Sequence, residues 1–138
     1  MEEKLLVEVC FGKCFCGNVE FEVEGKHSAC GNCHCDTCKH FYSAPFNTAV
    51  IYKKTGFKFT KGEDLTKTYD TGEVNRYFCG ECGTRLVNLA KERNIASIPL
   101  SILRKGDNSR PKISPLGHVF YDKHLIPVPD LKFKVSNF

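Results

Sequence analysis

The clearest pattern of apolar and polar positions in this chain lies in residues 18–24. Three apolar residues alternate there with glutamates, in the order Asn-Val-Glu-Phe-Glu-Val-Glu, and a glycine follows. A period of two is typical of a strand with one buried face, so a β-strand ending at that glycine is predicted. An earlier strand is predicted at residues 5–11, and Gly12 and Lys13 are expected to form the turn after it.

Short apolar runs separated by turn residues continue along the chain, and no window keeps a period of 3.6. One helical turn is expected in residues 36–41, with Asp36 or Thr37 as its cap. This pattern predicts a mostly β protein that forms a single domain over residues 1–138. Pro99 indicates a sheet edge or a bulge. The further strands are expected at residues 46–52, 57–60, 67–71, 84–89, 95–103 and 118–121.

Composition changes this picture little. The 138 residues are 41% hydrophobic, which is ordinary for a globular protein, and no stretch approaches the roughly 20 apolar residues that span a membrane. The acidic N-terminus does not resemble a secretory signal. We therefore expect a cytoplasmic protein with no membrane partner. Bound zinc would lower the formal charge of +4 to about +1, so no nucleic-acid partner is expected either.

Nine cysteines change the picture most, because seven of them stand at short spacings. Such spacings are typical of metal ligands, and a reducing compartment disfavours disulfides. Zinc suits sites made only of thiolates, with an iron–sulfur cluster as the minor alternative. Cys10 and Cys30 fit neither regular spacing and are expected to be buried or spare thiols. The seven are Cys14, Cys16, Cys33, Cys35, Cys38, Cys79 and Cys82.

Seven thiols divide most simply into a set of four and a set of three. Two pairs distant in sequence, Cys14 with Cys16 and Cys79 with Cys82, are expected to close a tetrahedral structural zinc site. The other three, residues 33, 35 and 38, would leave one coordination position open. In the competing partition, Cys30 or His34 supplies a fourth ligand and makes the second site structural as well.

An open site with three thiolates favours one kind of chemistry. Its net negative charge makes zinc a weak Lewis acid, poorly suited to producing hydroxide from water. A soft fourth ligand such as a substrate thiol suits it better and would be held as a thiolate. The predicted function is therefore a reaction at a carbon–sulfur bond, with Cys33, Cys35 and Cys38 as the catalytic residues.

Three ordered cysteine motifs together resemble the glutathione-dependent formaldehyde-activating enzyme family, which includes the centromere protein V proteins. They are Gly-Lys-Cys-Phe-Cys-Gly from residue 12, Cys-His-Cys-Asp-Thr-Cys-Lys from residue 33, and Phe-Cys-Gly-Glu-Cys-Gly-Thr-Arg-Leu from residue 78. The match spans about residues 12–130. The resemblance implies an Mss4-like fold of antiparallel β-ribbons around zinc, and the same division into a structural and a catalytic zinc.

The family's named activity joins formaldehyde and glutathione into S-(hydroxymethyl)glutathione. The resemblance thus implies a carbon–sulfur lyase with two zinc ions and a small thiol substrate such as glutathione. A non-catalytic zinc module that binds a protein partner is the alternative. A chromatin or microtubule binder, by analogy with the centromere members, is disfavoured because no long basic extension is present.

Several other residues have two interpretations each. Lys39, Arg76 and Arg85 are candidates for steering the carboxylates of glutathione, or else surface and structural ion-pairing residues. His34 is either an acid–base group or a residue that points away from the metal. His118 and His124 are expected to be ordinary strand and loop residues. Phe41 and Phe46 are expected either to wall the pocket or to pack in the core.

Overall fold

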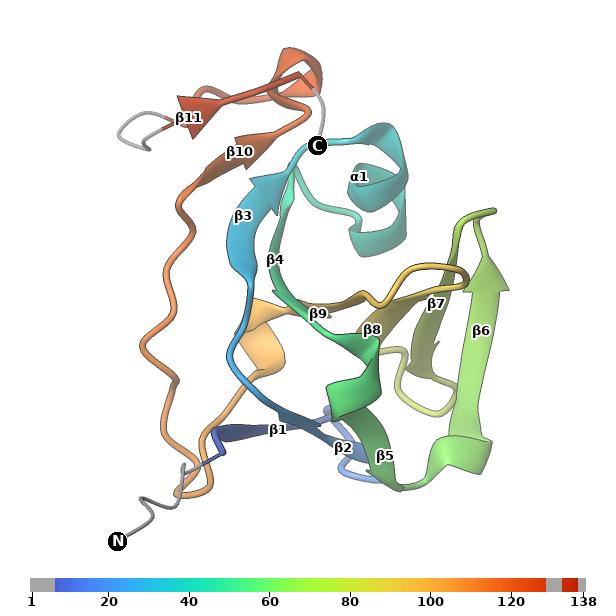
Figure 1. The fold of residues 1–138 in the computed structure, drawn as a ribbon. Coiled ribbons are helices and arrows are strands. Elements are labelled where there is room, and N and C mark those ends of the chain that lie inside the picture. Colours follow the sequence, from blue (N-terminus) through green and yellow to red (C-terminus); the bar gives the residue numbers. More distant parts are fainter. Residues whose placement is uncertain (1–6, 129–132, 137–138) are drawn as a thin grey trace, which may run out of the picture.

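The computed structural model describes residues 7–128 and 133–136, which form two β-sheets (Figure 1). Every strand pair is antiparallel except those of β10, which pairs in parallel with β3 and β11. The prediction of a mostly β protein is confirmed. The smaller sheet has the order β1 (Val9–Lys13), β2 (Glu20–Glu24), β5 (Phe57–Lys61). The larger has the order β11 (Phe133–Lys134), β10 (Gly117–Val119), β3 (Ala29–Cys33), β4 (Asn47–Tyr52), β9 (Ala96–Pro99), β8 (Arg85–Ala90), β7 (Val74–Cys79), β6 (Thr66–Asp70).

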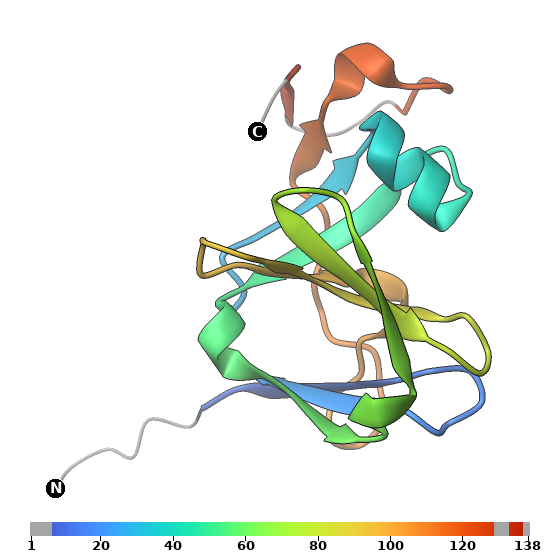
Figure 2. The ribbon, with the colours of Figure 1, turned by 90° about the vertical axis from the view of Figure 1, so that its right-hand side faces the viewer.

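The core lies between the two sheets, which face each other in Figure 2. Val19, Phe21 and Val23 are almost fully buried, as the alternating pattern predicts, while the glutamates between them point outward. Phe21 packs against Phe57 of the neighbouring strand at 5.1 Å between ring centroids. Burying one such side chain stabilises a fold by about 2–3 kcal/mol. The larger sheet contributes Val50, Tyr52, Leu86, Val87 and Ile98 to the same core.

One α-helix, α1 (Asp36–Tyr42), connects β3 to β4. Its N-cap is Cys35, whose Sγ accepts a hydrogen bond from the backbone N–H of Cys38 at 3.3 Å. The expectation of Asp36 or Thr37 as cap was therefore wrong by one or two positions. The helix is closed by Ser43 in the left-handed conformation, two residues before Pro45, at which the sequence predicts its end. Four short 3-10 helices complete the described fold: η1 (Lys54–Gly56), η2 (Glu63–Leu65), η3 (Leu100–Ile102) and η4 (Tyr121–Lys123).

Two strand predictions needed correction, one near each of Pro99 and Gly12. Pro99 does not mark an edge, because β9 lies between β4 and β8. It is instead the last residue of that strand, where a missing N–H costs least, and η3 replaces the continuous strand expected to residue 103. Gly12 and Lys13 belong to β1 rather than to a turn, and the turn begins at Cys14.

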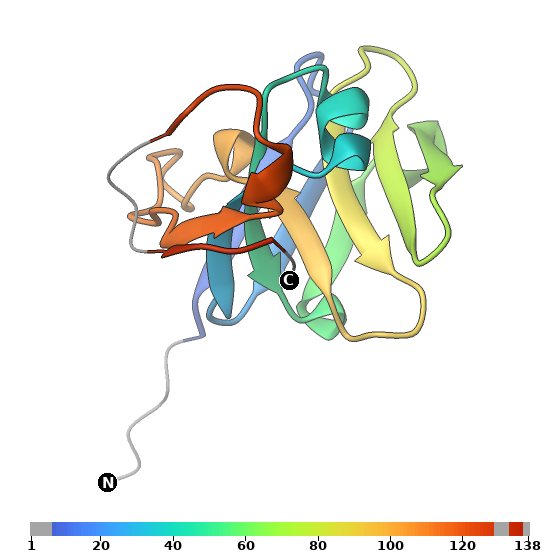
Figure 3. The same ribbon diagram turned by 90° about the horizontal axis from the view of Figure 1, so that it is seen from above.

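The C-terminal part brings a distant segment to the end of the molecule that carries α1. β10 stops at Val119 because Phe120 adopts a positive φ of 55°. From above, this segment lies beside α1 (Figure 3), and the Lys39 side chain donates a hydrogen bond to the Lys123 carbonyl at 2.6 Å. The sequence also predicts an extended tail around Pro127 and Pro129, of which Pro129 lies outside the described residues. Within those residues, no helix is long and apolar enough to span a bilayer.

Candidate metal centres and their pocket

Two hairpin turns bring four thiols together at one side of the structure. Cys14 and Cys16 belong to the turn between β1 and β2, whereas Cys79 ends β7 and Cys82 follows in the next turn. All four sulfur atoms lie within 4.8 Å of one another, with 3.5 Å between Cys14 and Cys16 and 3.9 Å between Cys16 and Cys79. Tetrahedral zinc with bonds of about 2.3 Å spaces its sulfurs about 3.8 Å apart. The four-thiol cluster therefore fits a closed zinc site.

Backbone N–H groups in these turns point at the sulfurs. The Val19 amide donates to Cys14 Sγ at 3.3 Å, and the amides of Glu81 and Cys82 donate to Cys79 Sγ at 3.4 and 3.5 Å. Such bonds favour the charged thiolate form that a metal ligand needs. The two turns are also tied to each other, because the Phe15 amide donates to the Thr84 hydroxyl at 3.0 Å.

Three further thiols converge where β3 meets α1. Cys33 ends the strand, Cys35 caps the helix and Cys38 lies in its first turn. Their sulfurs also lie within 4.8 Å of one another, with 3.4 Å between Cys33 and Cys35. Neither Cys30 nor His34 belongs to this three-thiol cluster. Cys30 is instead part of the hydrophobic core, and burial raises the pKa of its thiol to about 11.

The three thiols compete for negative charge. Hydrogen bonds from Cys33 and Cys38 lower the pKa of the Cys35 thiol. The bond to Cys35 in turn raises the pKa of Cys33, because Cys33 then serves as the donor. The Cys35 thiolate is thus stabilised by hydrogen bonds from neighbouring thiols, which in turn hold their own protons more tightly. A divalent cation is what would allow all three to ionise together, so the donor set fits a soft metal ion such as zinc.

His34 turns away from this cluster. Its ring is fully buried, and its Nε2 lies 2.8 Å from Nδ1 of His118, which is also fully buried, in β10. Phe46 packs on the His34 ring at 5.0 Å between centroids. Burial, followed by the nearby His118, lowers the pKa of His34 to about 4. Of its two interpretations, the one that points the side chain away from the thiols matches the structure.

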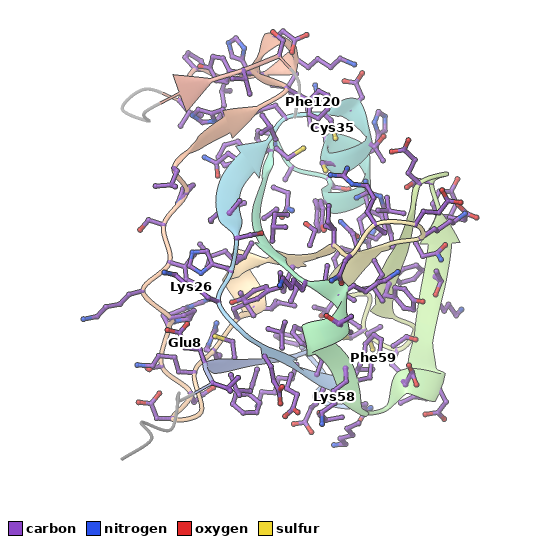
Figure 4. All side chains as sticks on the ribbon, viewed as in Figure 1. Glu8, Lys26, Cys35, Lys58, Phe59 and Phe120 are labelled. Atoms are coloured by element: carbon purple, nitrogen blue, oxygen red, sulfur yellow. The ribbon has the colours of Figure 1, made fainter. Side chains whose placement is uncertain are left out.

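A pocket of about 300 Å³ opens beside the three-thiol cluster, and its wall includes all three cysteines. Cys35 and Phe120, which both line it, lie close together in Figure 4 at the end that carries α1. No cysteine of the four-thiol cluster lines this pocket. Apolar residues make up most of the remaining wall, together with six polar residues. The lining polar residues are Asn47, Glu73, Arg76, Asn88, Arg93 and Ser97.

The three basic residues singled out in the sequence have different positions. Arg76 on β7 lines the pocket, and its Nη1 donates to Cys38 Sγ at 4.0 Å. Arg85 does not line it. Its Nε and Nη1 donate to the carbonyls of Phe41 and Gly83, which ties the start of β8 to α1. Lys39 does not line the pocket either, and its side chain forms an ion pair with Asp36 at 3.1 Å.

Pattern reasoning missed some pocket residues and left two phenylalanines open between pocket and core. Asn47 and Asn88 are buried polar residues of the pocket wall that the sequence did not single out. A possible signal was an asparagine inside the apolar run of β8, since asparagine is depleted in strands. Phe41 and Phe46 do not line the pocket. Phe41 instead carries the Arg85 guanidinium at 4.5 Å from its ring centroid.

Comparison with known proteins agrees with this architecture. A crystal structure of a Rhodobacter sphaeroides protein, a structural genomics target, superposes with a TM-score of 0.60 at 21% identity, covering 78% of this chain and 98% of that one. This likeness concerns the fold. An uncharacterized lyase of Schizosaccharomyces pombe is 28% identical over 75 residues, which cover 54% of this chain and 53% of the relative. The match thus spans about half the length of that relative.

A family model provides the broadest match. The model of the glutathione-dependent formaldehyde-activating enzyme aligns with residues 9–123, which include both cysteine clusters and β10. This range covers most of the chain and the whole lining of the pocket. The protein belongs to the glutathione-dependent formaldehyde-activating enzyme family.

Proposed function

We propose that this protein is a zinc-dependent carbon–sulfur lyase that acts on glutathione adducts or related thiols. Family membership and the lyase relative support a glutathione-related lyase activity as a class. The observation that carries the finer proposal is the position of the three-thiol cluster in the wall of a pocket. The four-thiol cluster has a full tetrahedral set of ligands and lines no part of that pocket.

In this proposal the two clusters have different tasks. Cys14, Cys16, Cys79 and Cys82 would hold a structural zinc, and Cys33, Cys35 and Cys38 would hold a catalytic one. Bound by Cys33, Cys35 and Cys38, a zinc ion would supply an open coordination position suited to a thiol and would favour its thiolate form at neutral pH. All nine cysteines are free of disulfides, which suits a reducing compartment such as the cytoplasm.

The chain's own residues would bind and orient the substrate. Aliphatic side chains such as Ile51, Val74 and Val119 line the pocket and exclude water from the reacting atoms. Holding a thiol next to an aldehyde carbon replaces a bimolecular encounter by an oriented one. In the addition, a carbon–sulfur bond forms, the carbonyl π bond breaks and the former carbonyl oxygen takes up the thiol proton. The reverse reaction releases aldehyde and thiol.

A rate measurement with matched cysteine variants tests this function. Exchange between glutathione and S-(hydroxymethyl)glutathione is followed by NMR, above the uncatalysed background, for wild type, Cys38→Ser and Cys10→Ser. We expect Cys38→Ser to lose about 100-fold or more of the enzymatic rate, because it removes a ligand of the open site. Cys10 belongs to neither cluster, so Cys10→Ser should keep the rate. A wild-type rate in Cys38→Ser, or none above background in wild type, would refute the proposal.

A further inference from the structure

Arg76 is a buried cation with no acidic partner in the described part of the chain. Arg76 lies in β7 and is 7% exposed. The four ion pairs among the described residues do not include it. Its Nε donates to the Thr71 hydroxyl at 3.2 Å, and its guanidinium lies over the Phe41 ring at 5.4 Å. Neither contact neutralises its charge, and a buried charge without compensation is strongly unfavourable.

The sulfurs of the three-thiol cluster are the compensating groups that its geometry offers. Nη1 donates to Cys38 Sγ at 4.0 Å, and Cys38 is itself only 7% exposed, so water screens the charge between the two groups poorly. The other charged residues of the pocket wall, Glu73 and Arg93, are both exposed and are therefore screened by water. Arg76 is thus the buried cation of the pocket that touches a sulfur of the cluster.

The charge balance of the site explains why such a cation is needed. Three thiolates around a divalent ion leave one net negative charge, and a substrate thiolate adds a second. In a buried site this second charge opposes substrate binding, because water screens it poorly. One fixed guanidinium next to the sulfurs offsets the charge of the resting site and so lowers the cost of adding the substrate thiolate.

We propose that Arg76 is the counter-ion of the three-thiol cluster and that it makes thiolate binding there favourable for any thiol, whether or not the thiol carries a carboxylate. This inference rests on the proposed function of the cluster as a metal-held thiol site. Arg76 acts through Cys38 and the charge of the cluster, so it is a positioning residue. The competing role, a fork that grips a substrate carboxylate, would make its effect depend on that carboxylate.

Cobalt-substituted protein separates these roles without relying on turnover. The wild type is compared with Arg76→Met, Arg76→Lys and the control Arg110→Met, which removes an equal charge from an exposed position outside the pocket. Glutathione and the uncharged thiol 2-mercaptoethanol are titrated separately, and the sulfur-to-cobalt charge-transfer band is recorded. We expect Arg76→Met to weaken both thiols by about tenfold or more. Its charge-transfer band should move to longer wavelength, because sulfur lone pairs rise in energy when the adjacent cation is removed.

Arg110→Met should keep the wild-type band and affinities, and Arg76→Lys should restore part of both. Weakening of glutathione alone would overturn the inference and make Arg76 a carboxylate-binding residue. Wild-type behaviour of Arg76→Met would overturn it too, while wild-type protein that binds no thiol would instead refute the proposed function. If Arg76→Met does not fold, Arg76→Lys decides: a wild-type band position together with tenfold weaker binding of glutathione alone contradicts the counter-ion role.

Discussion

At the scale of single residues, burial sets the chemistry of a thiol that lies outside the two cysteine clusters. Cys30 lies in β3 and is 4% exposed, next to apolar core residues such as Val50 and Ile98. Desolvation disfavours its thiolate and raises the pKa of the thiol to about 11, against an ordinary value near 9. Cys30 therefore behaves as a small apolar side chain.

This shift predicts a loss of stability at alkaline pH. Between pH 9 and about 11 the unfolded chain loses the Cys30 proton while the folded chain keeps it, so the free energy of unfolding falls as pH rises. The full effect is at most about 3 kcal/mol. Denaturant unfolding from pH 8 to 11 should show a steeper decline for wild type than for Cys30→Val. Equal slopes in the two proteins would contradict this assignment.

At the scale of elements, the turn after β5 packs against the β1–β2 turn that carries Cys14 and Cys16. Gly62 has a φ of 70°, and a Cβ built on it would collide with the backbone carbonyl of Asn18. The Lys61 side chain donates a hydrogen bond to the Gly17 carbonyl at 3.2 Å in the same region. A glycine at position 62 thus permits both a left-handed turn and a close approach of two backbones.

Replacing Gly62 tests how much this close contact of two backbone segments contributes to stability. Gly17 is a matched control, since its φ of 79° is similar and a Cβ there meets open space. Gly17→Ala should cost about 1 kcal/mol of unfolding free energy, for the backbone conformation alone. Gly62→Ala should cost about 2 kcal/mol or more beyond that, because a backbone carbonyl cannot move aside. Chemical denaturation of both variants measures the difference, and equal losses would show that the two segments separate freely.

At the scale of the whole molecule, the two clusters connect the fold differently. The four-thiol cluster joins the β1–β2 turn of one sheet to the β7–β8 turn of the other, across a sequence separation of 63 from Cys16 to Cys79. The three-thiol cluster joins only residues 33–38. Closing a long loop restricts the unfolded chain more than closing a short one, so the first cluster should contribute more to stability.

Metal stoichiometry and melting should therefore separate the clusters. We expect two zinc ions per wild-type chain by native mass spectrometry. Cys35→Ser should lose one ion and keep a cooperative melt, because serine can still cap α1. Cys79→Ser should lose the cooperative melt, since about 10 kcal/mol of zinc binding is coupled to folding there. Unfolding of both variants would mean that both centres are structural, and one ion per wild-type chain would contradict the two-site scheme.

Much of the fold and of the site was predictable from local features. Strand alternation located β2, and short spacings identified the seven clustered cysteines, because both depend on neighbours within a few residues. The exact helix caps and strand ends were not predictable. At α1, the Cys35 sulfur accepts the hydrogen bond of the Cys38 amide, so Cys35 is the cap instead of the expected residue. Pro99 lies in an inner strand because it ends the ladder instead of interrupting it.

The sequence by itself determined the mostly β class, the thiol chemistry and the resemblance to a lyase family. Only the tertiary structure decided which of three basic residues reaches the cluster, that His34 faces His118, and that a pocket opens beside three thiols and not four. The reason is physical. Periodicity and ligand spacing are properties of short segments, whereas the surroundings of Arg76 come from β7, α1 and the turn after β6, which approach one another only when the sheets are packed.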